Sequence, residues 1–191
     1  MRRGAALALM IPGLSVVSVL FAAAVRAGPA PKVFPPGCWK GTGVFGETLN
    51  KGGLKAKVTN GKLKFGLIAG KGPKASVLGA MDTGGHGSGS LTTAGTKIAM
   101  EVEMVGDYTM YGTPPSPKVK GQQRWTGSAL YNGTKIPVDF KLPVHGVPMT
   151  ITTVSAAKVS GFFGKPTSKW TAGRIAKPGL TGQQCLKAAG V

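Results

Sequence analysis

Lysine is the residue type whose spacing in this sequence most clearly suggests chemistry. Within residues 53–65, lysines alternate with other residues, and they are Lys55, Lys57, Lys62 and Lys64. Alternation at every second position is typical of β-structure and places these ammonium groups on one face. Asn60-Gly61 is a preferred pair for a two-residue hairpin turn, and a turn there sets Lys57 opposite Lys64. Because like charges that face each other across a sheet repel, this face is a solvated surface, a protected sheet edge or an anion-binding site.

A second candidate site is the segment 106–121, which has no clear strand pattern. Loops of this length inside a small domain are either functional or simply flexible surface. Tyr108 and Tyr111 precede Lys118 and Lys120 in this segment. Aromatic rings followed by ammonium groups are suited to stack on and neutralise a sugar or nucleotide polymer.

Signals for catalysis are sparse. Asp82-Thr83-Gly84 resembles the D-T-G motif of aspartic peptidases, and the resemblance implies that Asp82 is a catalytic acid. Such a site needs two carboxylates that share a proton, so a single motif implies a homodimer. The chain has only six acidic residues, and the spacing of its two histidines, His86 and His145, matches no zinc motif. We therefore expect a non-enzymatic protein with no catalytic residue, no metal site and no cofactor.

The net charge indicates the kind of partner. Lysine and arginine total 24 against six acidic residues, which gives a formal charge of +18. Lysine is a hydrated point charge that suits diffuse attraction, whereas arginine is preferred for bidentate recognition. After residue 27 the only arginines are Arg124 and Arg174. The composition therefore predicts an anionic polymer or a membrane or envelope surface as partner, without sequence-specific recognition of nucleic acid. Solubility alone is the alternative reason for the charge.

The N-terminus is typical of an export signal. Arg2 and Arg3 precede an uncharged segment, 4–25, and Ala27 ends a small-residue cleavage site. We predict a secretory signal peptide over 1–27 and a secreted, periplasmic or cell-surface protein. An uncleaved membrane anchor is the alternative, because a segment of this length can span a bilayer. Residues 28–37 are rich in proline and are expected to form an extended spacer.

Two cysteines bracket the remaining domain, 38–191. In an exported protein an even cysteine count indicates a disulfide, here Cys38–Cys185. Acylation of Cys38 as a lipoprotein is the alternative. Thr181 and Gln184 match a helix capping box, so a short helix over 181–189 would carry Cys185 back to Cys38.

Turn signals at short intervals predict the fold. Residues 95–104 and 133–142 are similar, and each follows a turn signal, at Ala94-Gly95 and at Asn132-Gly133. These turns pair Gly89 with Met100 and Gly127 with Val138, and small residues opposite large ones indicate a tightly curved sheet. Further strands are expected at 75–81, 149–154, 158–163 and 169–174. The prediction is an all-β domain, a single antiparallel barrel or sandwich of about ten strands built from sequential hairpins, with a short C-terminal helix.

Three tryptophans, Trp39, Trp125 and Trp170, are each followed by small residues and are expected in the core. A tryptophan near the start of the first barrel strand is similar to the pattern of lipocalin-type and avidin-type barrels. The resemblance implies an alternative function, a carrier of a small apolar ligand inside a lipocalin-like barrel. Glycines at 87, 89 and 127 would leave room for such a ligand.

Overall fold

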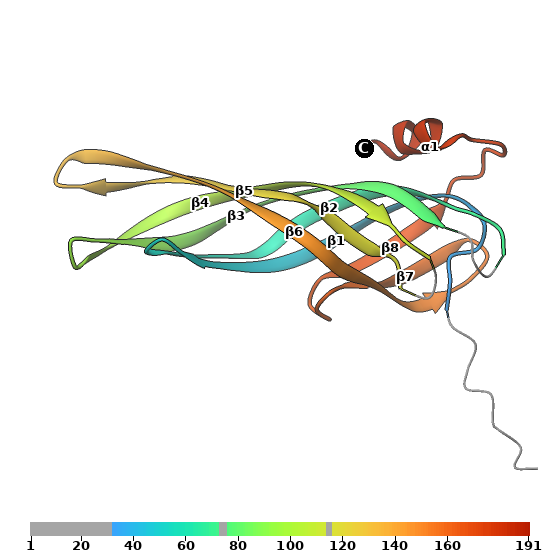
Figure 1. The fold of residues 1–191 in the computed structure, drawn as a ribbon, viewed down its shortest axis with the longest axis horizontal. Coiled ribbons are helices and arrows are strands. Elements are labelled where there is room, and N and C mark those ends of the chain that lie inside the picture. Colours follow the sequence, from blue (N-terminus) through green and yellow to red (C-terminus); the bar gives the residue numbers. More distant parts are fainter. Residues whose placement is uncertain (1–31, 73–75, 114–115) are drawn as a thin grey trace, which may run out of the picture. The chain divides into compact units, whose positions relative to one another are not determined.

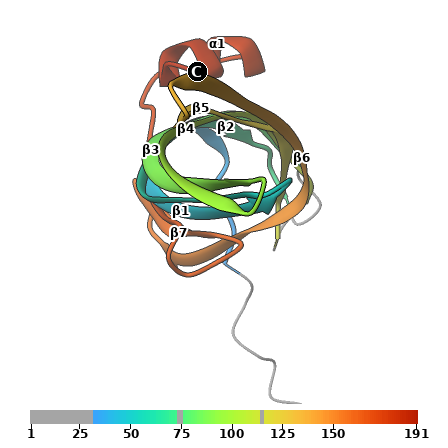
Figure 2. The ribbon, with the colours of Figure 1, turned by 90° about the vertical axis from the view of Figure 1, so that its left-hand side faces the viewer.

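The computed structural model describes residues 32–72, 76–113 and 116–191, and their strands form one closed antiparallel barrel (Figures 1 and 2). The eight strands follow one another in an up-and-down order, and the last pairs with the first. They are β1 (Gly37–Lys51), β2 (Leu54–Ala69), β3 (Val77–Thr93), β4 (Thr96–Tyr111), β5 (Lys118–Tyr131), β6 (Thr134–Val154), β7 (Lys158–Phe163) and β8 (Lys169–Arg174). The predicted all-β architecture is confirmed. Of the two predicted arrangements, barrel and sandwich, the structure forms the barrel.

Three long hairpins share one kind of turn. The turn residues Gly52-Gly53, Ala94-Gly95 and Asn132-Gly133 all have positive φ angles, between 44° and 79°. A two-residue type I′ turn needs positive φ at both positions, which glycine and asparagine tolerate best. The predicted turns at 94–95 and 132–133 are confirmed, together with the predicted pairing of Gly89 with Met100 and of Gly127 with Val138.

The predicted turn at Asn60-Gly61 is wrong. β2 continues through these residues, with a β-bulge between Val58 and Lys62 against β3. A bulge adds one residue and so shifts the alternation of inward and outward side chains, as a two-residue turn also does. Gly61 is required by packing, because a Cβ there would lie 2.3 Å from Cζ of Phe45.

The described residues form eight strands, not about ten, because the strands are longer than predicted. Residues 149–154 are the end of the 21-residue β6, and the two halves of the supposed hairpin 53–65 are one strand. The supposed loop 106–121 is largely strand, since β4 runs to Tyr111 and β5 starts at Lys118. Long strands leave fewer turns, which changes the count but not the order of pairing.

The barrel is closed over only part of its length. β8 pairs with β1 over residues 39–43, and β7 pairs with β6 over 149–154. Within the described residues, β1 after residue 43 pairs only with β2, and β6 before residue 149 pairs only with β5. These two stretches are free edges of a curled sheet. Pro137 lies in this stretch of β6, and a residue without an N–H donor is best tolerated at a sheet edge.

The core contains the three tryptophans, as predicted: Trp39, Trp125 and Trp170 are at most 2% exposed. Phe34 stacks on Trp170 with 5.7 Å between ring centroids and is itself buried. Phe34 belongs to the predicted spacer 28–37, so the described part of that spacer contributes to the core. The predicted signal peptide, 1–27, lies outside the described residues.

The C-terminal helix α1 (Gly182–Ala189) is tied to the barrel by the predicted disulfide. The Sγ atoms of Cys38 and Cys185 are 1.99 Å apart, and the capping box of Thr181 and Gln184 is formed. The helix packs on the outer face of β2, where a Cβ on Gly66 would lie 2.5 Å from Cβ of Ala189 (Figure 1). A disulfide is consistent with an extracellular location. No described helix is long and apolar enough to cross a membrane.

Candidate functional site

The outward face of β2 carries a row of exposed lysines, which we call the lysine row. Its members are Lys55, Lys57, Lys62 and Lys64. Since a strand rises about 3.3 Å per residue, Lys55 and Lys57 are spaced by roughly 7 Å, and so are Lys62 and Lys64. The bulge lies between these two pairs. The sequence placed these side chains on one face correctly. It paired Lys57 with Lys64 across a turn, whereas both lie on the same strand, opposite Ser88 and Asp82 of β3.

Lys64 is the most constrained member of the row. Its Nζ lies 3.2 Å from Oδ2 of Asp82 and donates a 2.8 Å hydrogen bond to the carbonyl oxygen of Gly190, beyond α1. Asp82, the residue of the D-T-G motif, therefore lies on the outer wall of the barrel in an ion pair. The residue directly opposite Asp82 on β4 is Asp107.

Two grooves adjoin the lysine row. One, of about 630 Å³, is bordered by Lys62, Lys64 and Asp82. The other, of about 360 Å³, is bordered by Lys55, Lys97, Ser88 and Ser90, and we call it the Lys55–Lys97 groove. Ser90 is directly opposite Lys55 and is only 8% exposed. Two ammonium groups and two hydroxyl groups thus surround this groove, and its lining contains no carboxylate.

Lys118 and Lys120 do not join the lysine row. Both lie on the outward face of β5, and β3 and β4 lie between β5 and β2 in the sheet. The outward face of β4 carries the carboxylates of Glu101, Glu103 and Asp107. The two basic regions are therefore separated by the acidic part of β4, residues 101–107.

The two tyrosines of the predicted loop have different surroundings. Tyr111 is half-buried, and Nζ of Lys120 lies 5.1 Å from its ring centroid, a cation–π contact. Tyr108 was expected as a loop contact, and this is wrong: it points into the barrel and is 8% exposed. The reason is that β4 continues through this segment, so alternation carries Tyr108 inward with Met104 and Met110.

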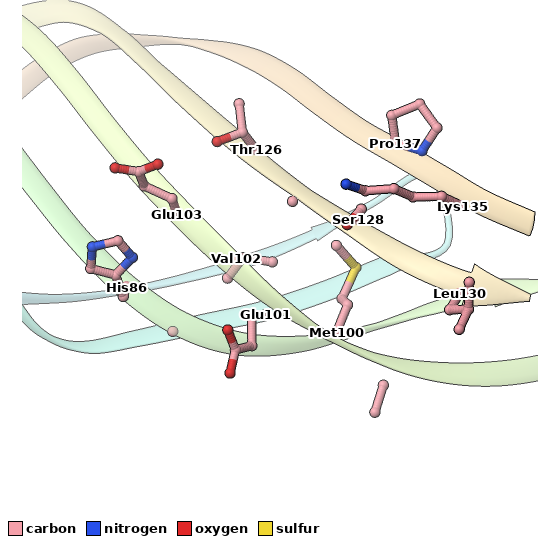
Figure 3. A pocket seen from close by; sticks show the side chains of 13 residues that line it. His86, Met100, Glu101, Val102, Glu103, Thr126, Ser128, Leu130, Lys135 and Pro137 are labelled. Atoms are coloured by element: carbon pink, nitrogen blue, oxygen red, sulfur yellow. The ribbon is translucent and has the colours of Figure 1, made fainter.

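A further hollow of about 1240 Å³ lies on the outer wall over β3, β4, β5 and β6 (Figure 3). Glu103 of β4 lies between His86 of β3 and Thr126 of β5, which are its partners in the two neighbouring strands. Glu101 and Lys135 also border the hollow, so its charge is mixed. Among the described residues, no group of three or more histidine, cysteine, aspartate or glutamate side chains is placed to hold a metal ion.

A small cavity of about 90 Å³ lies inside the barrel, and the sequence reasoning missed it. Its polar lining residues are Glu47, Thr83, Tyr108, Gln123 and Ser168. The Oη of Tyr108 lies 3.5 Å from Oγ1 of Thr83, and burial raises the pKa of this phenol above its ordinary value. The sequence did contain one sign of this cavity. Glu47 is a carboxylate at a position of β1 where alternation with Phe45 and Leu49 predicts an inward, apolar side chain.

The glycines expected to leave room for a ligand, at 87, 89 and 127, do not border the interior cavity. A Cβ on Gly87 would be 2.0 Å from the carbonyl oxygen of Lys57, and one on Gly127 would be 2.5 Å from that of Glu101. These glycines allow neighbouring strands to approach closely in the curved sheet. The cavity lies elsewhere, beside Glu47 and Tyr108.

Comparisons with protein-family models, curated protein sequences and solved structures found no match to this chain.

Proposed function

We propose that this chain is a secreted, basic β-domain that binds an anionic polymer outside the cell, and that it is a binding or structural protein and not an enzyme. The single observation that carries the proposal is the Lys55–Lys97 groove. Lysines from β2 and β4 border it together with Ser88 and Ser90 of the intervening strand. Sulfate, phosphate and carboxylate groups accept hydrogen bonds from ammonium and hydroxyl donors, and charge-assisted bonds are the stronger kind.

The lysine row extends this groove along β2. The row presents two pairs of ammonium groups, Lys55/Lys57 and Lys62/Lys64, each with a spacing of roughly 7 Å along the strand, and these pairs can contact separate charges of a polymer. The guanidinium group of Arg124 is already held in a bidentate pair with the carboxylate of Asp139. Recognition would therefore depend on lysine charge, and affinity should fall steeply with salt as counterions are released.

Heparin provides the first test. The purified protein would be eluted by a salt gradient from a heparin column and from a sulfonate cation exchanger of equal charge density. We expect elution from heparin at higher salt, because an organised groove adds to net charge. Elution from both columns at equal salt would reject an organised anion site and leave the charge as a solubility feature.

Matched variants locate the site. The double substitution Lys55→Glu/Lys97→Glu should lower the salt needed for elution from heparin much more than Lys118→Glu/Lys120→Glu. The two variants change the net charge equally, but only the first alters the groove. Equal losses would overturn the groove as the site.

Binding to vesicles of anionic lipid in the absence of heparin binding would replace the polymer with a membrane surface. A retained β circular-dichroism spectrum controls for unfolding.

Two other functions remain hypotheses. The small apolar-ligand carrier has one supporting observation, the interior cavity, although Glu47 makes its lining partly polar. The aspartic peptidase would show acid-optimal proteolysis that Asp82→Asn abolishes. Its candidate carboxylate pairs with Lys64, and Asp107 lies opposite it on β4.

A further inference from the structure

The interior cavity has a defined place in the fold, at the level where the closed part of the barrel ends. Phe45 and Glu47 of β1 border it, as do Val144 and Val147 of β6. In both strands these residues lie beyond the pairing with β8 and β7. The cavity is therefore set between two strand edges that no described strand joins. Glu47 is half-buried.

Glu47 is unusual among the acidic residues of the chain. Alternation along β1 points it inward, between Phe45 and Leu49, which are both buried. Asp82 and Asp139 each pair with a basic side chain on the outer wall. Within the part of the chain that the structure describes, no lysine, arginine or histidine forms an ion pair with Glu47. A carboxylate partly removed from water without a counter-charge is unfavourable, so a cation at this position would stabilise it.

The rest of the lining suits an organic cation better than a metal ion. Three aromatic rings border the cavity, those of Phe45, Tyr108 and Phe163. Two thioether side chains, Met81 and Met104, and four aliphatic side chains form the rest of its apolar wall. The faces of aromatic rings attract ammonium groups, and this attraction strengthens where water is excluded. A tightly held metal ion usually takes several carboxylate, imidazole or thiolate ligands, and the described lining supplies one carboxylate, that of Glu47, with no histidine or cysteine.

The polar groups of the cavity are held in place. Tyr108 is 8% exposed, and its Oη lies 3.5 Å from Oγ1 of Thr83. Nε1 of Trp125 donates a 3.4 Å hydrogen bond to Oε1 of Gln123, which also borders the cavity. Burial is the main cause of the raised pKa of Tyr108, and the negative charge of Glu47 contributes, so the two groups act on each other inside the barrel.

We propose that this cavity binds a small organic cation, an alkylammonium or quaternary ammonium group, with Glu47 as its counter-charge and the aromatic rings as its walls. The cavity, at about 90 Å³, is smaller than the engineered apolar cavity of about 150 Å³ that accommodates benzene. It therefore fits a short alkyl chain or a compact ammonium head. This site is independent of the lysine row, which lies on the opposite face of the sheet.

The test is a titration of the purified full chain with n-butylammonium chloride at constant ionic strength, followed by NMR. 1-Pentanol, of similar length and uncharged, is the matched probe. We expect saturable binding of n-butylammonium, with shifts of the amides of Phe45, Thr83 and Tyr108 and of the Trp125 indole N–H. Glu47→Gln should weaken this binding by about tenfold or more, because it removes the counter-charge and keeps the shape. Pentanol should bind wild type and variant equally.

The control is Glu103→Gln, which removes the same charge from the outward face of β4. It should leave n-butylammonium binding unchanged. The proposal is overturned if wild type shows no saturable binding, if Glu47→Gln and Glu103→Gln behave alike, or if pentanol binds as tightly as the ammonium ion. Heparin elution of Glu47→Gln should match that of wild type, so failure here is distinguishable from failure of the polymer-binding proposal.

Discussion

The indole ring of Trp170 covers the backbone of Gly161, its cross-strand partner between β8 and β7. A Cβ on Gly161 would lie 2.6 Å from Cζ2 of Trp170 and 1.8 Å from the carbonyl oxygen of Thr150. Trp170 also packs edge-on against Phe65, with 5.6 Å between ring centroids. The aromatic cluster that fills the closed end of the barrel therefore depends on a missing side chain at position 161.

Gly161→Ala should destabilise the protein by about 1–3 kcal/mol, the usual range for overpacking a core. The blocking atom is a backbone oxygen on the neighbouring strand, so the clash is relieved only if β6 and β7 separate. Urea unfolding followed by tryptophan fluorescence measures the free energy of unfolding. Gly173→Ala on β8 is the control, because nothing lies within 4 Å of a Cβ there. Equal stability of the two variants would refute the packing argument.

Removing the disulfide should destabilise the fold without abolishing the barrel. Cys38 and Cys185 are separated by 147 positions, and closing so long a loop restricts the unfolded chain. We expect Cys38→Ser/Cys185→Ser to lose about 2–4 kcal/mol of unfolding free energy. Thermal unfolding under reducing and oxidising conditions gives the measurement.

Hydrogen exchange locates the effect of the lost cross-link. The amides of α1 should exchange faster in the serine variant, because the helix is tied to β1 through Cys185. Amides of β4 and β5, which are three and four strands from β1 in the pairing order, should stay protected. Uniform loss of protection would instead show that the disulfide supports the whole barrel.

Two-residue turns were predictable because their chemistry is local. Asn132-Gly133 adopts the positive φ angles that its residue types favour, and the register of β5 and β6 follows from it. The same reasoning failed at Asn60-Gly61, where the pair lies within a bulge and Phe45 covers the glycine. A two-residue turn and a bulge both shift the alternation of inward and outward side chains by one position, so the local sequence is the same for both. The packing of Phe45, which is distant in sequence, favours the bulge.

The candidate sites divide in the same way. Alternation alone placed the lysine row on one face, and the wrong turn did not alter that face. The Lys55–Lys97 groove and the interior cavity each combine residues from several strands. The first depends on the pairing of β2 with β3, and the second on how far β7 and β8 extend. Neither is encoded in a local pattern, so the sequence predicted the charges and missed the cavity.

The surface pair of Arg124 and Asp139 should be visible in an acid titration. Nε and Nη2 of Arg124 donate to the two carboxylate oxygens of Asp139 at 3.0 and 2.7 Å. These bonds lower the pKa of Asp139 below its ordinary value of 3.8. The pairing of ionised Asp139 with Arg124 therefore contributes its full stabilisation above about pH 3.8, and this contribution is lost as the pH falls through the lowered pKa of Asp139. NMR titration of the carboxyl carbon should show a higher pKa in Arg124→Gln, and an unchanged pKa would contradict the pairing.

Tyr108 should make the barrel sensitive to alkaline pH. Burial raises its pKa above the ordinary value of 10.0, because the phenolate is poorly solvated inside the barrel. The unfolded chain ionises first as the pH rises, so the stability that Tyr108 contributes is complete below about pH 10 and is lost as the pH passes through the raised pKa. Denaturant unfolding at increasing alkaline pH should show a steeper loss in wild type than in Tyr108→Phe. Since lysines titrate in the same range in both proteins, the difference between them isolates the buried phenol. Identical pH profiles would place Tyr108 in contact with solvent and remove it from the wall of the cation site.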